Sequence, residues 1–149
     1  MVNLQTVTAA EHAFIDHEHV ELGPGLERIH DLAARVGTIG PRDLGYELLH
    51  VLRWFETVLL PHAAWEESVI YDRVDVQAGT HWATRLMRFE HEQIKRIAAQ
   101  LAEDRRPLIE GVASHEQQSE LRGRLFALEA LIRAHVEREE AYLFPLLEP

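Results

Sequence analysis

The chain has 149 residues, a formal net charge of −10 at pH 7, ten histidines and no cysteine. This length suffices for one domain with a hydrophobic core, so we expect a single domain over residues 1–149. The acidic excess disfavours nucleic acid as a partner, because phosphate backbones bind basic surfaces. The lack of cysteine excludes disulfides and thiolate ligands, whereas the many histidines suit a metal site of nitrogen and oxygen donors.

The sequence also carries no membrane or export signal. No apolar run has the length that spans a bilayer, and Met1 to Thr8 lack the basic start and apolar stretch of a signal peptide. We therefore expect a cytoplasmic protein with no membrane partner. No feature of the pattern indicates an oligomeric state.

The first half of the chain predicts two helices, because apolar and histidine side chains recur at three- and four-residue spacing. The first helix runs from about Thr8 to Val36, and Gly23-Pro24-Gly25 predicts a kink or a break in its hydrogen bonds. A turn at 37–43 follows, in which Asp43 is placed to cap the second helix. That helix extends to about Tyr71 and should bend at Pro61.

The second half predicts two more helices. After a connection at 74–80, Thr80 is placed to cap a third helix, whose stripe starts at Leu86 and reaches Leu101. Residues 104–112 are expected to form a turn, and Ser114 with Gln117 matches a capping box before the last helix. No segment alternates with the period of a strand. The prediction is an all-α, up-down-up-down antiparallel four-helix bundle.

One motif occurs twice, as His62-Ala-Ala-Trp-Glu66 and as His135-Val-Glu-Arg-Glu139. Residues four apart on a helix lie one turn apart on the same face, so each pair can bind one ion. A further histidine precedes each motif, His19 by 43 residues and His91 by 44. The chain therefore reads as two copies of one helical hairpin, each with the spacing of metal ligands.

The predicted turns place the four histidines at one height in the bundle. His19 lies 21 positions before Gly40 and His62 lies 21 positions after Pro41, while His91 and His135 lie 21 and 23 positions from Val112. Glu66 and Glu139 then lie one turn to the side. Buried imidazoles and carboxylates require partners, and bound metal ions would provide them.

These residues resemble the hemerythrin-like (HHE cation-binding) family over nearly the whole chain. The family pattern is a lone histidine, His-x-x-x-Glu, another histidine and a second His-x-x-x-Glu, and Leu143-Phe144-Pro145 after the last motif is also typical. The resemblance implies a non-haem centre of two iron ions joined by an oxo or hydroxo bridge. It also implies terminal ligands His19, His62, His91 and His135, with Glu66 and Glu139 as bridging carboxylates.

The first ligand has an alternative in His17, which is rotated off the buried stripe, so we favour His19. His12 shares the stripe but lies about 10 Å further along the helix axis. Glu67 and Glu140 point about 100° away from the ligand line, which suits contact with the ligands from outside or with solvent. The other histidines have no matched partner and should face solvent: His30, His50, His81 and His115.

The third helix departs from oxygen-carrying hemerythrins, which have a second histidine four residues from the first. Here these positions hold Met87 and Lys95. Four histidines, two bridging carboxylates and a bridging oxygen supply about 10 of the roughly 12 bonds of two octahedral ions. Tyr142, on the stripe of His135, is a candidate for a missing ligand or for a hydrogen-bond donor beside the ligands, unless it is an ordinary core tyrosine.

The resemblance and the open positions predict a protein that binds or reduces a small oxidant, namely hydrogen peroxide, dioxygen or nitric oxide. Catalase-like turnover of peroxide is the favoured activity, because two open positions can admit it. The alternative is a non-catalytic sensor, store or carrier of oxygen or iron. Relatives that deliver iron for cluster repair often have a cysteine-bearing segment, which this chain lacks.

Overall fold

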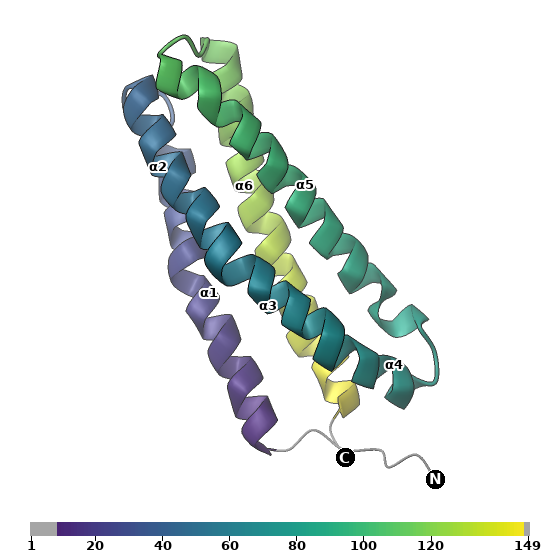
Figure 1. Ribbon diagram of the computed structural model, residues 1–149. Helices are drawn as coiled ribbons and strands as arrows, with labels where there is room; N and C mark the ends of the chain where they lie inside the picture. Colours follow the sequence, from purple (N-terminus) through teal and green to yellow (C-terminus); the bar gives the residue numbers. More distant parts are fainter. Residues whose placement is uncertain (1–8, 148–149) are drawn as a thin grey trace.

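The computed structural model describes the backbone of residues 9–147 and the side chains of residues 18–147. Every regular element in this part of the chain is helical, and the elements form four rods that lie side by side (Figure 1). The first rod is α1 (Ala9–Arg35) and the third is α5 (Trp82–Glu110). None of these helices is long and apolar enough to cross a membrane.

The second and fourth rods are interrupted by π-helical turns. The second rod comprises α2 (Pro41–Trp54), η1 (Phe55–Leu59), α3 (Leu60–Trp65), η2 (Glu66–Ile70) and α4 (Tyr71–Ala78). The fourth comprises α6 (His115–Arg138), the π-helical turn η3 (Glu139–Leu143) and the 3-10 turn η4 (Phe144–Leu147). A π turn holds one extra residue, so the buried face moves by one position after it.

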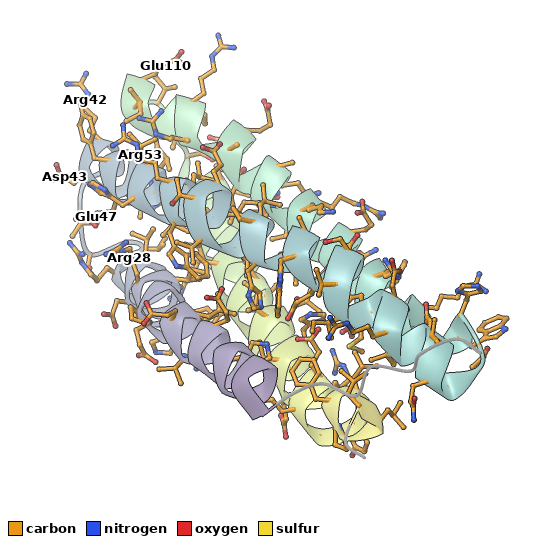
Figure 2. All side chains as sticks on the ribbon, turned by 60° about the horizontal axis from the view of Figure 1, so that its bottom comes forward. Arg28, Arg42, Asp43, Glu47, Arg53 and Glu110 are labelled. Carbon is orange, nitrogen blue, oxygen red and sulfur yellow. The ribbon has the colours of Figure 1, made fainter. Side chains whose placement is uncertain are left out.

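The rods form a closed ring of neighbours. α1 packs against α2 and α6, and α5 packs against α2, α4 and α6. The α1–α2 and α5–α6 turns lie at one end of the bundle, and the α4–α5 connection lies at the other (Figure 1). Charged side chains cover the outside at and near the end with the two turns (Figure 2): Arg28, Arg42, Asp43, Glu47, Arg53 and Glu110.

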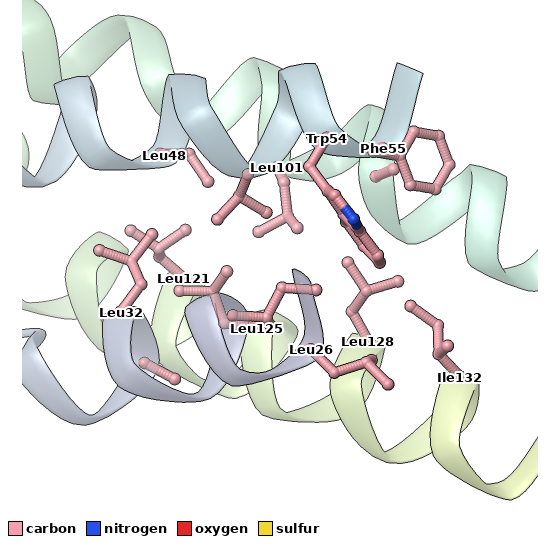
Figure 3. Close-up of a cluster of buried hydrophobic side chains, with 14 of the residues drawn as sticks. Leu26, Leu32, Leu48, Trp54, Phe55, Leu101, Leu121, Leu125, Leu128 and Ile132 are labelled. Carbon is pink, nitrogen blue, oxygen red and sulfur yellow. The ribbon is translucent and has the colours of Figure 1, made fainter. Parts of the chain in front are cut away.

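Two apolar clusters fill the interior at different heights. The larger cluster draws on all four rods, including Leu26, Leu48, Leu101 and Leu125 (Figure 3). The smaller cluster joins the second, third and fourth rods: Ile70, Tyr71, Val74, Met87, Leu143, Phe144 and Leu147. On each of these three rods, the predicted ligands lie between residues of the two clusters. The polar centre is therefore enclosed above and below by hydrocarbon.

Helix α1 continues through Gly23-Pro24-Gly25, where the sequence predicts a kink or a break. At Gly25, an added Cβ would lie 1.8 Å from the Trp54 ring, whereas at Gly23 it would have no neighbour within 4 Å. Gly25 thus allows the indole of α2 to pack against the backbone of α1. Around Pro61, the expected bend takes the form of the π turn η1, which ends just before α3 begins.

Several predicted boundaries are wrong. The predicted connection at 74–80 is helical as far as Ala78, and Gly79 ends α4 with a φ of 67°. α5 continues through Pro107 to Glu110, because buried Leu108 anchors its last turn in the larger cluster. Gly40, not Asp43, is the N-cap of α2. The capping box of Ser114 and Gln117 is confirmed.

Candidate metal centre

All six predicted ligands converge in the interior. Glu66, His91, His135 and Glu139 present ligand atoms within 4.8 Å of one another, and His19, His62 and Glu66 do the same. None of the six residues is more than 8% exposed. Glu66 belongs to both groups, so the arrangement has two adjoining halves that share a carboxylate.

The two carboxylates lie between imidazoles from different rods. Glu66 Oε1 lies 2.9 Å from His62 Nε2 and 3.3 Å from His19 Nε2, and its Oε2 lies 3.3 Å from His91 Nε2. Glu139 Oε1 lies 3.3 Å from His135 Nε2, and its Oε2 lies 3.4 Å from His19 Nε2. Each glutamate therefore spans two sides of the centre, which is the position that a bridging carboxylate needs.

Every histidine also has a carboxylate on its outer nitrogen. Nδ1 lies 2.9 Å from Glu140 in His19, 2.8 Å from Glu67 in His91 and 3.0 Å from Glu90 in His135. His62 Nδ1 lies 3.5 Å from Glu18, within ion-pair distance but without a hydrogen bond. An Nδ1–H that donates outward leaves the Nε2 lone pair facing inward, as metal-binding imidazoles require.

These outer contacts run in one direction around the bundle. Each carboxylate serves the histidine of the next rod: Glu18 serves His62, Glu67 serves His91, Glu90 serves His135, and Glu140 serves His19. Arg138 in turn donates to Glu90 and holds it in place. For Glu67 and Glu140, where the sequence left outer contact or solvent open, the structure shows contact with a histidine from outside.

The sequence analysis does not identify Glu18 and Glu90 as residues of the centre, although the sequence contains a pattern that could have identified them. Each directly precedes the lone histidine of its hairpin, as Glu18-His19 and Glu90-His91. The repeated pattern is therefore Glu-His followed by His-x-x-x-Glu-Glu, which is longer than the ligand motif alone.

The tyrosine beside the ligands is Tyr71, and the prediction of Tyr142 is wrong. Tyr142 is 75% exposed, whereas Tyr71 is fully buried. The Tyr71 hydroxyl donates to Glu139 in a very short hydrogen bond and lies 3.3 Å from His91 Nε2 and 3.4 Å from His135 Nε2. Tyr71 therefore belongs to the half formed by His91, His135 and Glu139.

The π turns explain this error. Both η2 and η3 begin at a central glutamate, and the N–H that closes each turn comes from the residue five positions later, Tyr71 or Phe144. In an unbroken α-helix, Tyr142 would follow Glu139 on the buried face. The extra residue in η3 turns Tyr142 outward and brings Phe144 inward, with its ring 5.5 Å from that of His19.

The metal-free centre balances its charges with protons. Burial alone would lower the pKa of His19, but the adjacent carboxylates of Glu139, Glu66 and Glu140 raise it from 6.5 to about 10. Burial alone would raise the pKa of Glu66, but the adjacent imidazoles of His19, His62 and His91 hold it well below its usual value. Burial, with the nearby charges of Glu66 and Glu139, raises the pKa of Tyr71, which keeps the phenol protonated.

The centre fits a cation, because it contains acceptors with no donor. Among the described residues, the buried side-chain atoms without a hydrogen-bond partner are His62 Nδ1, Glu66 Oε2 and Glu139 Oε2. The two carboxylate oxygens lie only at ion-pair distance from imidazoles, 3.3 Å from His91 Nε2 and 3.4 Å from His19 Nε2. A buried carboxylate oxygen without a partner is unfavourable, and a positive ion between the two glutamates would remove this penalty. The donors are imidazole nitrogen and carboxylate oxygen, a set that suits iron, manganese or zinc.

The other histidines lie as the sequence predicts, as far as the structure describes them. His30 is half exposed and bonds to Glu129, while His50, His81 and His115 are exposed. The side chains of His12 and His17 lie outside the described residues. His19, which the sequence favours over His17, lies in the buried group with His62 and Glu66.

Comparison with known proteins agrees with this geometry. The family model of the hemerythrin HHE cation binding domain matches residues 11–147. The chain belongs to this family. No curated protein and no solved structure gives a match. The predicted resemblance is therefore confirmed, and this HHE domain is a metal-binding helical bundle.

A small cavity adjoins the HHE centre. Its free volume is about 10 Å³. This is close to the minimum that holds a single water molecule. His62, Glu66, His91 and His135 line one side, and the rest of the lining is mainly apolar, including Leu59, Ile94 and Ile132. Lys95, whose side chain is 39% exposed, also lines it.

Proposed function

We propose that the domain holds two iron ions in an up-down-up-down bundle. His91 and His135 would bind one ion, His19 and His62 the other, and Glu66 and Glu139 would bridge them. The observation that carries this proposal is the pair of buried glutamate oxygens without donors, at the point where four imidazoles converge. Membership of the HHE family supports the choice of metal binding.

The two halves of the centre differ in one oxygen donor. The Tyr71 hydroxyl lies within reach of the His91 and His135 half, and a bound cation would favour its deprotonated form. The equivalent position in the other repeat is Phe144, which supplies no donor. We infer that Tyr71 would supply an oxygen donor to an ion held by His91 and His135, and that an ion held by His19 and His62 would lack such a donor.

This arrangement supports chemistry on a small oxidant, with peroxide as the favoured substrate. The cavity leads to His62, Glu66 and His91 and has room for about one water-sized molecule, so only the smallest oxidants suit it. Bound iron would supply the redox change. In peroxide disproportionation, one peroxide is oxidised to dioxygen and a second is reduced to two waters. The chain's own residues exclude bulk water and hold the carboxylates in place.

A sensor, store or carrier is the second candidate. The observation in its favour is the enclosure of the centre, because the smaller apolar cluster closes one side and the cavity beside the centre barely holds a water molecule. Slow entry of ligand suits retention of a bound molecule better than rapid turnover. The cytoplasmic location remains a prediction.

Metal analysis and a peroxide assay on the purified protein together test the proposal. We expect two iron ions per chain, a visible band from tyrosinate bound to ferric iron, and dioxygen evolution on addition of peroxide. Tyr71→Phe should abolish the band and leave the iron content near two, whereas Tyr142→Phe should change neither. One ion per chain would refute the two-ion centre. Two ions without dioxygen evolution would favour the sensor or store.

A further inference from the structure

The two halves of the metal centre offer an ion different donors. We name each half by its aromatic residue: the tyrosine half comprises His91, His135 and Tyr71, and the phenylalanine half comprises His19, His62 and Phe144. The two aromatic rings correspond, because each lies five residues after a central glutamate and has its centroid 5.5 Å from the ring of a histidine. Only the tyrosine half therefore has a hydroxyl at this position.

The imidazoles of the two halves are also held unequally from outside. In the tyrosine half, both Nδ1 atoms bond to a carboxylate, at 2.8 and 3.0 Å. In the phenylalanine half, His19 Nδ1 bonds to Glu140, whose side chain is 51% exposed. His62 Nδ1 is buried without a hydrogen bond, 3.5 Å from Glu18. Loss of one such outer contact typically lowers metal affinity about 10–100-fold, so His62 is the least firmly oriented of the four imidazoles.

The halves share both central carboxylates. Glu66 lies 3.3 Å from an imidazole of the tyrosine half through Oε2 and 2.9 Å from one of the phenylalanine half through Oε1. Glu139 does the same at 3.3 and 3.4 Å, with its two oxygens in the opposite order. A first ion would offset part of this shared negative charge and repel a second ion. The shared carboxylates therefore favour binding in two steps.

We propose that the tyrosine half binds its ion first and more tightly, and that the phenylalanine half holds a weaker, exchangeable second ion. This order rests on the two-ion centre of the proposed function. Where free metal is scarce, the domain then carries one ion, and the second ion joins as metal becomes abundant. Occupancy of the phenylalanine half would thus link any chemistry that needs both ions to the supply of metal.

Zinc titration of the metal-free, full-length chain tests this order, because zinc accepts imidazole and oxygen donors and needs no oxidant. Competition with a chromophoric chelator should resolve two steps, the first at least about tenfold tighter than the second. His62→Ala should remove the weaker step and keep the tighter one, whereas His91→Ala should remove the tighter step. Far-UV circular dichroism checks that both variants fold.

Variants at the two aromatic positions assign the steps without loss of a histidine. Tyr71→Phe should weaken the first step at least about tenfold. Phe144→Tyr should tighten the second step by a similar factor, because its hydroxyl would lie beside the phenylalanine half as that of Tyr71 lies beside the tyrosine half. Tyr142→Phe is the control and should change neither step, since Tyr142 is exposed.

The possible results separate this order from the two-ion centre itself. Two steps of equal affinity, or loss of the tighter step in His62→Ala, would overturn the order and leave the two-ion centre intact. A second step that is unchanged in Phe144→Tyr, together with a first step that is unchanged in Tyr71→Phe, would overturn the aromatic residues as its cause. A single zinc ion per chain at every concentration would refute the two-ion centre and the order with it.

Discussion

At the scale of single residues, the centre depends on contacts one step removed from the ligands. Glu67, Glu90 and Glu140 orient three of the imidazoles from outside, and Tyr71 donates to Glu139 from within. Glu18 lies at ion-pair distance from the fourth imidazole, His62. Since the ligand nitrogens all face inward, a change in any outer partner should alter metal affinity without removing a ligand.

Glu90→Gln should weaken metal binding by about 10–100-fold, because it removes the charge that holds His135 and Arg138. Competition with a chromophoric chelator measures the affinity. Glu137→Gln, on an exposed position of α6, is the matched control and should have no effect. Equal affinities in the two variants would show that the outer ring is irrelevant to binding.

Tyr71→Phe should destabilise the metal-free fold by about 1–3 kcal/mol, because Glu139 loses a buried hydrogen-bond donor. Tyr142→Phe should stay within about 0.5 kcal/mol of the wild type, because its ring is exposed. Urea unfolding followed by circular dichroism measures both values. The prediction fails if the two variants unfold alike.

At the scale of elements, two local devices set the position of the rods. The π turns η2 and η3 each displace the buried face by one residue directly after a central glutamate. Gly25 brings α1 and α2 close together, since the Trp54 ring occupies the space of a Cβ. Gly25 acts on the rods that carry His19 and His62, and the π turns act on the second and fourth rods, which carry the two central glutamates.

Gly25→Ala should destabilise the fold by about 1–3 kcal/mol, because the added methyl overlaps the Trp54 ring and forces α1 away from α2. Gly23→Ala should be neutral or stabilise by up to about 1 kcal/mol, since the position is open and alanine favours the helix. Thermal unfolding of both variants gives the comparison. Similar losses in the two would argue against the close packing.

At the scale of the whole molecule, stability and metal binding are linked. The centre joins all four rods, and the unfolded chain cannot assemble it. Free metal at about 100 times the dissociation constant adds about 2.7 kcal/mol to the folded state, which corresponds to a rise in Tm of roughly 5–10 °C. Calorimetry before and after chelation measures this change. Identical Tm values would mean that the metal does not bind the folded state preferentially.

The sequence by itself determined the helical class, the capping box at Ser114 and the convergence of six buried histidine and glutamate side chains. These features follow from periodicity and from a four-residue spacing, both of which are local properties of a helix. The two repeats also predicted that the histidines of neighbouring rods lie at the same height, because each turn lies midway between the two histidines of its hairpin.

Only the tertiary structure decided which tyrosine reaches the centre and where the rods end. A π turn forms where tertiary packing compensates for the less favourable i→i+5 backbone hydrogen bonds. A sequence pattern with a regular 3.6-residue period therefore does not predict its position. Tyr71 and Tyr142 therefore exchange their expected roles. Likewise, α5 continues past Pro107 because burial of Leu108 outweighs a lost backbone hydrogen bond, a balance that depends on the neighbouring rods.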